Sequence, residues 1–149
     1  GELMTIVDWK PDGEEFPETR LVIITSTGNV KNAGADGLVM HAHIIGPDES
    51  RDLGPMDNIG VNDREAGSTD IFSLPFDFPV SEIQGVELVV VKGNDAWRVE
   101  SISFQSFDGG KKSKTYAFEV NQWFSAEKKD LDTIGAIKSK VFSFRPEVE

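Results

Sequence analysis

The chain has 149 residues and no cysteine, and it carries 26 acidic against 15 basic side chains. This length is typical of a single domain, which we expect to span residues 1–149, and it allows a core that needs neither disulfides nor a structural metal. The formal net charge of −11 disfavours nucleic acid as a partner, because such a surface repels phosphate backbones. The lack of cysteine excludes disulfide scaffolds, thiolate metal sites and cysteine nucleophiles.

No apolar run approaches the roughly 20 residues that a membrane-spanning helix needs, so we expect no transmembrane segment. The N-terminus, Gly1-Glu2-Leu3-Met4, lacks the basic start and the long apolar stretch of a signal peptide. These features fit a mature chain or an excised piece.

Short runs of β-branched and aromatic residues, separated by Gly, Pro, Asn and Asp clusters, predict an all-β fold. No segment has a long helical period. The spacing of the runs is close to that of β-sandwiches. In chain order, the expected strands cover residues 3–9, 20–26, 37–45, 70–74, 85–92, 98–107, 114–120 and 138–145.

Alternation of apolar and polar residues assigns a core face to two of these strands. Tyr116 and Phe118 share one such face, and Phe142 and Phe144 share another. The run over residues 86–91 is apolar on both faces. That pattern predicts a central strand that is covered on both sides.

Three connections between the strands, over residues 27–36, 46–69 and 93–96, are rich in Asp, Asn and Gly. The middle one exceeds the roughly 15 residues beyond which a loop is usually functional or disordered, so it is the first place to look for a function. Carboxylate, amide and carbonyl oxygens beside glycine are what calcium takes as ligands. The same residues are also ordinary turn formers, and composition does not separate the two interpretations.

Catalysis is not expected, because the sequence has no G-x-S-x-G nucleophile elbow. Paired carboxylates for glycoside chemistry stay open in a chain with 26 acidic residues, but composition alone does not position any two of them. His41 and His43 alternate on one expected strand and therefore share a face. A metal site is possible there in principle. We favour two polar positions on the solvated face of a strand, because no partner motif accompanies the histidines.

Several segments, taken in order, resemble a known family. They are Thr27-Gly28, Asn32-Ala33-Gly34-Ala35-Asp36, Gly67-Ser68-Thr69-Asp70-Ile71-Phe72, Trp97 and Phe118-Glu119-Val120-Asn121-Gln122-Trp123-Phe124-Ser125. Their order and spacing are similar to the "TG…GAGTD", "G-x-x-D-x-F" and "F-x-V-N-x-W-L-S" signatures of the PLAT domains of polycystins, lipoxygenases and alpha-toxins. The likeness is strongest to the C-terminal membrane-binding domain of clostridial alpha-toxin phospholipases. It covers residues 19–125, and residues 1–18 and 126–149 are expected to be edge strands or appended segments.

The resemblance implies an antiparallel eight-stranded β-sandwich of PLAT type, with calcium as cofactor on loops at one end. The residues carried over as calcium ligands are Asn32, Gly34, Asp95 and Ala96 for a first site, Asp57, Asn58, Gly60 and either Asn62 or Asp63 for a second, and Asp36 for a third. Asn32 stands where the first loop of the alpha-toxins has a carboxylate. We therefore expect weak binding, in the roughly 10⁻⁴ to 10⁻³ M range of extracellular modules.

The function implied is that of a non-catalytic, calcium-dependent docking domain that targets an attached or partner enzyme to a phospholipid surface. Such a domain is expected outside the cell or at its surface, as a monomer or as part of a larger chain. Phe76 and Phe78 are the candidate lipid contacts, with an inter-strand plug as the alternative. Trp97 and Trp123 are expected to be buried. A protein-docking module and a carbohydrate-binding sandwich with structural calcium remain open alternatives.

Overall fold

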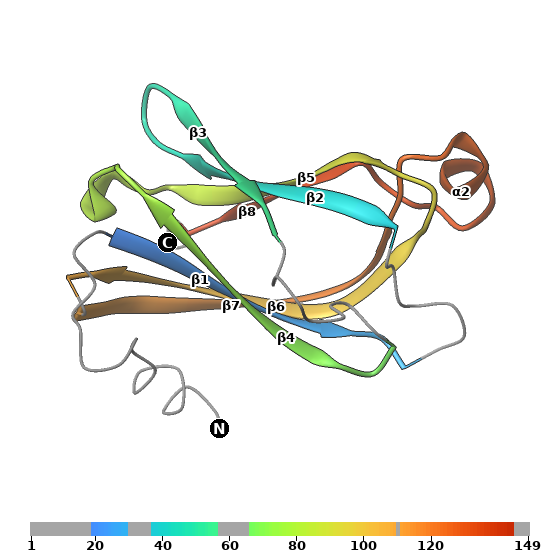
Figure 1. The fold of residues 1–149 in the computed structure, drawn as a ribbon, viewed down its shortest axis with the longest axis horizontal. Coiled ribbons are helices and arrows are strands. Elements are labelled where there is room, and N and C mark those ends of the chain that lie inside the picture. Colours follow the sequence, from blue (N-terminus) through green and yellow to red (C-terminus); the bar gives the residue numbers. More distant parts are fainter. Residues whose placement is uncertain (1–18, 30–36, 57–65, 110, 145–149) are drawn as a thin grey trace, which may run out of the picture.

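The computed structural model describes residues 19–29, 37–56, 66–109 and 111–144. Two four-stranded antiparallel sheets pack face to face as a β-sandwich (Figure 1), which confirms the expected fold class. The strands are β1 (Thr19–Thr27), β2 (Leu38–Ile45), β3 (Ser50–Pro55), β4 (Thr69–Phe76), β5 (Gly85–Gly93), β6 (Trp97–Asp108), β7 (Lys111–Phe124) and β8 (Ser139–Ser143). One sheet has the order β4-β1-β6-β7 and the other the order β3-β2-β5-β8.

Seven of the expected strands coincide with β1, β2 and β4 to β8. The eighth, over residues 3–9, lies outside the described residues. β3 lies inside the segment that was predicted to be a long loop, and the short helix α2 (Lys128–Thr133) was not predicted. A 3₁₀ turn, η1 (Val80–Glu82), lies between β4 and β5. No helix in the described part of the chain is long and apolar enough to cross a membrane.

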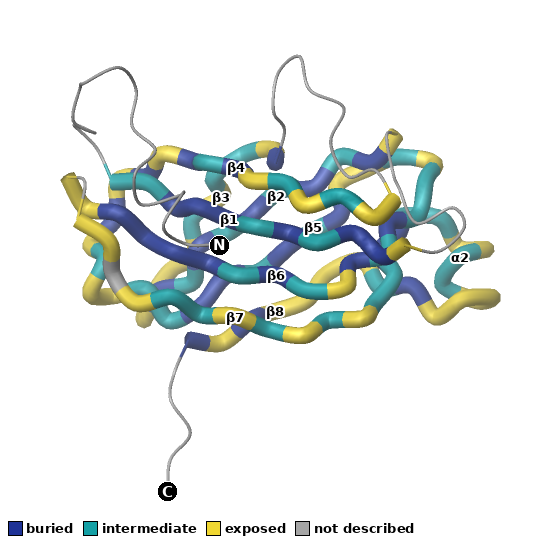
Figure 2. The backbone as a smooth tube through the Cα atoms, turned by 90° about the horizontal axis from the view of Figure 1, so that it is seen from below, coloured by how far each residue is buried: buried dark blue, intermediate teal, exposed yellow. Residues whose placement is uncertain are grey.

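The core lies between the two sheets and is rich in phenylalanine. Buried stretches run along the strands of the sandwich (Figure 2). Phe104 of β6 is fully buried and lies 5.4 Å from Phe142 of β8, measured between ring centroids. Tyr116 and Phe118 pack against this cluster, and the Tyr116 ring stacks on that of Phe144 at 4.2 Å. The core faces that alternation predicted for β7 and β8 are thus confirmed. Aromatic pairs of this kind stabilise the fold by more than the area they bury accounts for.

The prediction that the strand over residues 86–91 is covered on both sides is wrong. β5 does lie between β2 and β8, and Val86 and Leu88 are fully buried in the core. On the outer face, however, Val91 is 48 % exposed. A sandwich has two layers, so each sheet has one face in the core and one in water. The valines on the outer face of β5 reflect strand propensity rather than burial.

Two buried threonines on the inner face of β1 allow a matched test of hydrogen bonding. Thr27 Oγ1 accepts a bond of 2.8 Å from Trp97 Nε1, whereas buried Thr25 Oγ1 has no hydrogen-bond partner in the described structure. Thr25→Val should therefore raise the free energy of unfolding by about 1 kcal/mol, and Thr27→Val should lower it by about 1–3 kcal/mol because the indole N–H loses its acceptor. Urea unfolding measures both. Shifts of the same sign would contradict the assignment.

Candidate calcium-binding end of the sandwich

β1 ends, β2 and β4 begin, and β5 passes into β6 at the right-hand end of the sandwich in Figure 1. Backbone hydrogen bonds tie these strand ends together. Gly28 N–H, after β1, donates to the carbonyl of Arg98 in β6 at 2.8 Å, and Gly67 N–H, before β4, donates to the carbonyl of Gly28 at 3.1 Å. Anchors of all three Asp/Asn/Gly-rich connections therefore meet at one end of the fold.

The Asp95 carboxylate lies where the first connection enters β2. Its Oδ2 accepts a hydrogen bond of 2.8 Å from the N–H of Gly37, the residue just before β2. A Cβ on Gly37 would lie 2.7 Å from Asn94 Oδ1 and 3.1 Å from Asp95 Oδ2. Two side-chain oxygens thus lie beside the same backbone position. Such an all-oxygen donor set fits calcium, which prefers carboxylate, amide and carbonyl ligands.

The fully buried Trp97 fixes the position of this short β5–β6 connection. Its indole donates to Thr27 Oγ1 at the end of β1, and its ring lies 6.3 Å from that of Phe124. Because Trp97 directly follows Ala96 and lies two residues from Asp95 in the sequence, its place in the core limits where those residues can lie. The expectation that Trp97 is buried is confirmed.

Only two of the residues predicted as calcium ligands, Asp95 and Ala96, fall in the described part of the chain. The others lie outside it: Asn32, Gly34, Asp36, Asp57, Asn58, Gly60, Asn62 and Asp63. Asn94 was not predicted as a ligand, although its side-chain oxygen lies beside that of Asp95 at Gly37. The sequence signal that could have identified Asn94 as a ligand is its position next to an aspartate in a turn that contains glycine.

A model of the PLAT/LH2 domain family matches residues 21–137 of the chain. The chain belongs to the PLAT/LH2 domain family. This match extends beyond the segment over which the sequence motifs are similar and takes in α2. The comparison with curated proteins finds no match.

Solved structures similar to this PLAT domain include two kinds of larger protein. A coral 8R-lipoxygenase, described as activated by calcium through a C2-like domain, has a TM-score of 0.60 and 23 % identity over 83 % of this chain and 16 % of its own. The alpha-toxin of Clostridium absonum has a TM-score of 0.61 and 17 % identity over 91 % and 33 %. The alpha-toxin of Clostridium perfringens has a TM-score of 0.60 and 21 % identity over 96 % of this chain and 35 % of its own. These likenesses show the shared fold. The chain spans about a sixth of the lipoxygenase and about a third of each toxin.

The expectation that Phe76 and Phe78 contact lipid is wrong for this structure of the PLAT domain. Each is only 7 % exposed and belongs to the core cluster. β4 begins at the candidate calcium end, and Phe76 is its last residue. The Phe78 ring packs on Gly46, and the Arg51 guanidinium lies 5.5 Å from the ring centroid. The two rings close the opposite end of the sandwich, as the inter-strand plug alternative described.

The expectation that Trp123 is buried is also wrong. The side chain is half-buried, and the Arg98 guanidinium lies 5.9 Å from its ring. Trp123 pairs with Arg98 across β6 and β7, one residue before the fully buried Phe124. Neighbouring residues on a strand point to opposite faces, which places Trp123 on the outer face of its sheet.

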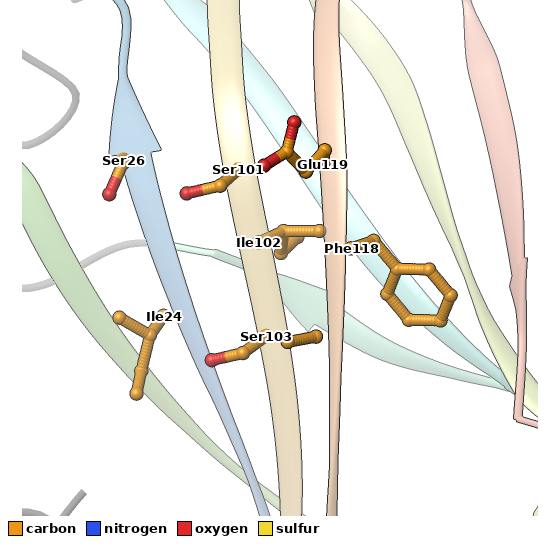
Figure 3. Close-up of a pocket in the computed structure, with 8 residues that line it drawn as sticks. Ile24, Ser26, Ser101, Ile102, Ser103, Phe118 and Glu119 are labelled. Carbon is orange, nitrogen blue, oxygen red and sulfur yellow. The ribbon is translucent and has the colours of Figure 1, made fainter. Parts of the chain in front are cut away.

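A shallow hollow of about 270 Å³ lies over β1, β6 and β7 (Figure 3). Ser26, Ser101 and Ser103 line it together with Ile24 and Glu119, whereas Phe118 points away from the serines. A serine nucleophile needs a neighbouring base such as histidine. Both histidines of the chain lie on β2, in the other sheet, so this hollow lacks a serine–histidine pair.

Proposed function

We propose that this PLAT domain is a non-catalytic, calcium-dependent docking domain that brings an attached or partner enzyme to a phospholipid surface. The observation that carries the proposal is that residues flanking three Asp/Asn/Gly-rich connections are hydrogen-bonded to one another at one end, where the Asp95 carboxylate and the Asn94 amide oxygen lie beside Gly37. Family membership and the described calcium activation of the coral lipoxygenase support it. The residues outside the described part, Asn32 to Asp36 and Asp57 to Asp63, are proposed to complete the ligand sets.

The docking mechanism we propose is electrostatic. At a net charge of −11, the domain without calcium is repelled by an anionic membrane. Bound calcium would offset the negative charge of the loops and present open coordination positions to phosphate oxygens. The chain's own part is to hold Asp95 at the entry to β2 and to keep the loop anchors together. Weak sites of this kind suit the calcium concentrations found outside the cell.

Sedimentation with liposomes tests this function. The chain is mixed with vesicles of phosphatidylcholine and phosphatidylserine, with millimolar calcium or with a chelator. We expect it to sediment with the vesicles only when calcium is present, and to be released by added chelator. Magnesium at the same concentration controls for simple charge screening, since it dehydrates reluctantly and needs near-ideal octahedral geometry. Equal sedimentation with calcium and with chelator would contradict the proposal.

Protein docking is the second candidate function, and two observations favour it. The only aromatic residues proposed for lipid contact, Phe76 and Phe78, are buried, and Val91 and Val141 are 48 % and 55 % exposed on the neighbouring strands β5 and β8. Val141 lies opposite Glu87, four residues before Val91 and away from the calcium end, and an exposed apolar position there is what a protein partner would use. If the chain binds calcium but does not sediment with vesicles, protein docking replaces phospholipid docking as the proposed function.

Carbohydrate binding has less support. It would require a platform of exposed aromatic rings. Among the residues that the structure describes, Trp97 is buried and Trp123 is half-buried beside Arg98, while Trp9 lies outside them. A single half-covered indole does not make such a platform.

A further inference from the structure

Both histidines of the chain lie on the outer face of the β3-β2-β5-β8 sheet, away from the core. His41 and His43 alternate with the fully buried Met40, Ala42 and Ile44 along β2. Their side chains are 23 % and 27 % exposed, so both imidazoles can be reached from solvent. Because they are two residues apart on one strand, both project from the same face.

A carboxylate from β3 joins the two imidazoles. Asp52 pairs with His43 in the β2–β3 register, and the register shifts between His41 and His43. The His41 Nδ1 lies 3.0 and 3.1 Å from the two carboxylate oxygens of Asp52, and His43 Nε2 lies 3.7 Å from Oδ1. One ligand atom from each of the three side chains lies within 4.8 Å of the other two.

These separations are close to those of a metal site. Zinc–nitrogen and zinc–oxygen bonds of roughly 2.0–2.2 Å at tetrahedral angles place neighbouring ligand atoms about 3.3–3.5 Å apart. The observed nitrogen–oxygen separations of 3.0 and 3.7 Å fall on either side of that range.

A backbone donor holds the Asp52 carboxylate in place. The N–H of Gly54 donates to Asp52 Oδ1 at 2.8 Å, which orients the carboxylate from within β3. Glu87 of β5 occupies the cross-strand position beside His43 and adds negative charge to the same face.

We propose that His41, His43 and Asp52 form a binding site for a divalent transition metal of the zinc type, on the sheet face and separate from the calcium end. Two imidazoles and one carboxylate suit zinc, whereas calcium prefers oxygen ligands alone. Because the three side chains are partly exposed, water occupies the fourth position. The ion ties the edge strand β3 to β2.

Titration of the whole chain with zinc tests this site, by calorimetry in excess calcium so that the acidic loops do not compete. We expect one zinc ion per chain and a rise in the melting temperature. Cobalt serves as a spectroscopic probe, because a tetrahedral nitrogen and oxygen site gives visible absorption bands. Since the chain has only two histidines, proton NMR reports both imidazoles directly, and the signals of both should move when zinc is added.

Variants assign the ligands. His41→Gln, His43→Gln and Asp52→Asn should each weaken zinc binding at least tenfold, while the calcium response stays as in the parent chain. Asp95→Asn is the matched control, since it removes one carboxylate at the other proposed site and should leave zinc affinity unchanged. Unmoved imidazole signals in the parent chain, or unchanged zinc affinity in the His41→Gln/His43→Gln double variant, would overturn the proposal. The NMR measurement decides even if a variant folds poorly.

Discussion

Gly93→Ala is expected to lower the free energy of unfolding by about 3 kcal/mol, the largest effect of any single substitution proposed for this chain. Gly93 ends β5 with a φ of +136°, which side chains rarely adopt. A Cβ there would collide with the carbonyl oxygen of Gly37 and lie 2.8 Å from the Cα of Leu38. Both of those atoms belong to backbone, so neither can move aside as a flexible side chain would.

Gly109→Ala is the matched control for this prediction. Gly109 also has a positive φ, of +62°, but a Cβ on it would meet nothing within 4 Å. Only the backbone strain remains, so the loss should be about 1 kcal/mol. Urea unfolding of both variants gives the two values. Equal losses would mean that the close approach of β5 to the entry of β2 does not matter for stability.

Gly93→Ala should also weaken calcium binding. Gly93 packs on Gly37 and Leu38, and Gly37 is the residue whose N–H donates to Asp95. Pushing the β5 end away from β2 would separate the carboxylate from the connection that it faces. The calcium-dependent rise in melting temperature should therefore shrink in Gly93→Ala and persist in Gly109→Ala.

Local signals in the sequence were enough to find most strands. Alternation along β7 and β8 marked the core side through Tyr116, Phe118, Phe142 and Phe144, and each of them packs in or against the core. These residues are large, and turn formers bound their strands, so the local pattern and the packing agree. The positions of the Asp/Asn/Gly-rich connections followed from the same pattern.

β3 was missed because its residues, Ser50–Pro55, carry almost no strand signal. The segment contains glycine and proline and no β-branched or aromatic side chain, so propensity argues against a strand. It is an edge strand that pairs only with β2 in its sheet, and that pairing is a tertiary contact. Without β3, no reasoning from sequence could place Asp52 beside His41 and His43.

α2 was missed for a different reason. Its six residues include none that is buried, so it has no apolar face to produce a helical period. The helix depends on bonds outside itself: Ser125 Oγ donates to Asp130 Oδ2 at 2.7 Å and accepts from the N–H of Glu127 at 3.0 Å. Such contacts become visible only once the chain is folded.

The two proposed cation sites differ in the features that select an ion. The calcium end is built from oxygen atoms on connections between strands, whereas the zinc site projects from two paired strands and includes nitrogen ligands. Loops can adjust to the large and variable coordination shell of calcium. Side chains on a sheet are held at nearly fixed spacing, which suits the small, tetrahedral shell of zinc. Each site should therefore respond to its own ion.

Asp95→Asn is expected to weaken calcium binding by at least about tenfold and to leave the stability of the calcium-free domain nearly unchanged. Asparagine keeps an oxygen that can accept the bond from Gly37 N–H, which Asp95 Oδ2 now accepts at 2.8 Å. What the substitution removes is the negative charge, and calcium affinity depends strongly on the number of charged ligands. The change therefore separates the ligand role of Asp95 from its structural role.

Thermal melts across a calcium series measure the effect. A ligand that binds only the folded state raises stability by RT ln(1 + [L]/Kd), about 2.7 kcal/mol at a hundredfold excess over Kd. In the parent chain the melting temperature should rise at millimolar calcium, and in Asp95→Asn the same rise should need at least about ten times more. Asp77→Asn is the matched control, because it removes one exposed carboxylate just beyond the opposite end of β4. Identical calcium curves for the parent chain and Asp95→Asn would show that Asp95 is not a calcium ligand. A shift in Asp95→Asn that Asp77→Asn does not share would come from the charge at the site, because both variants change the net charge equally.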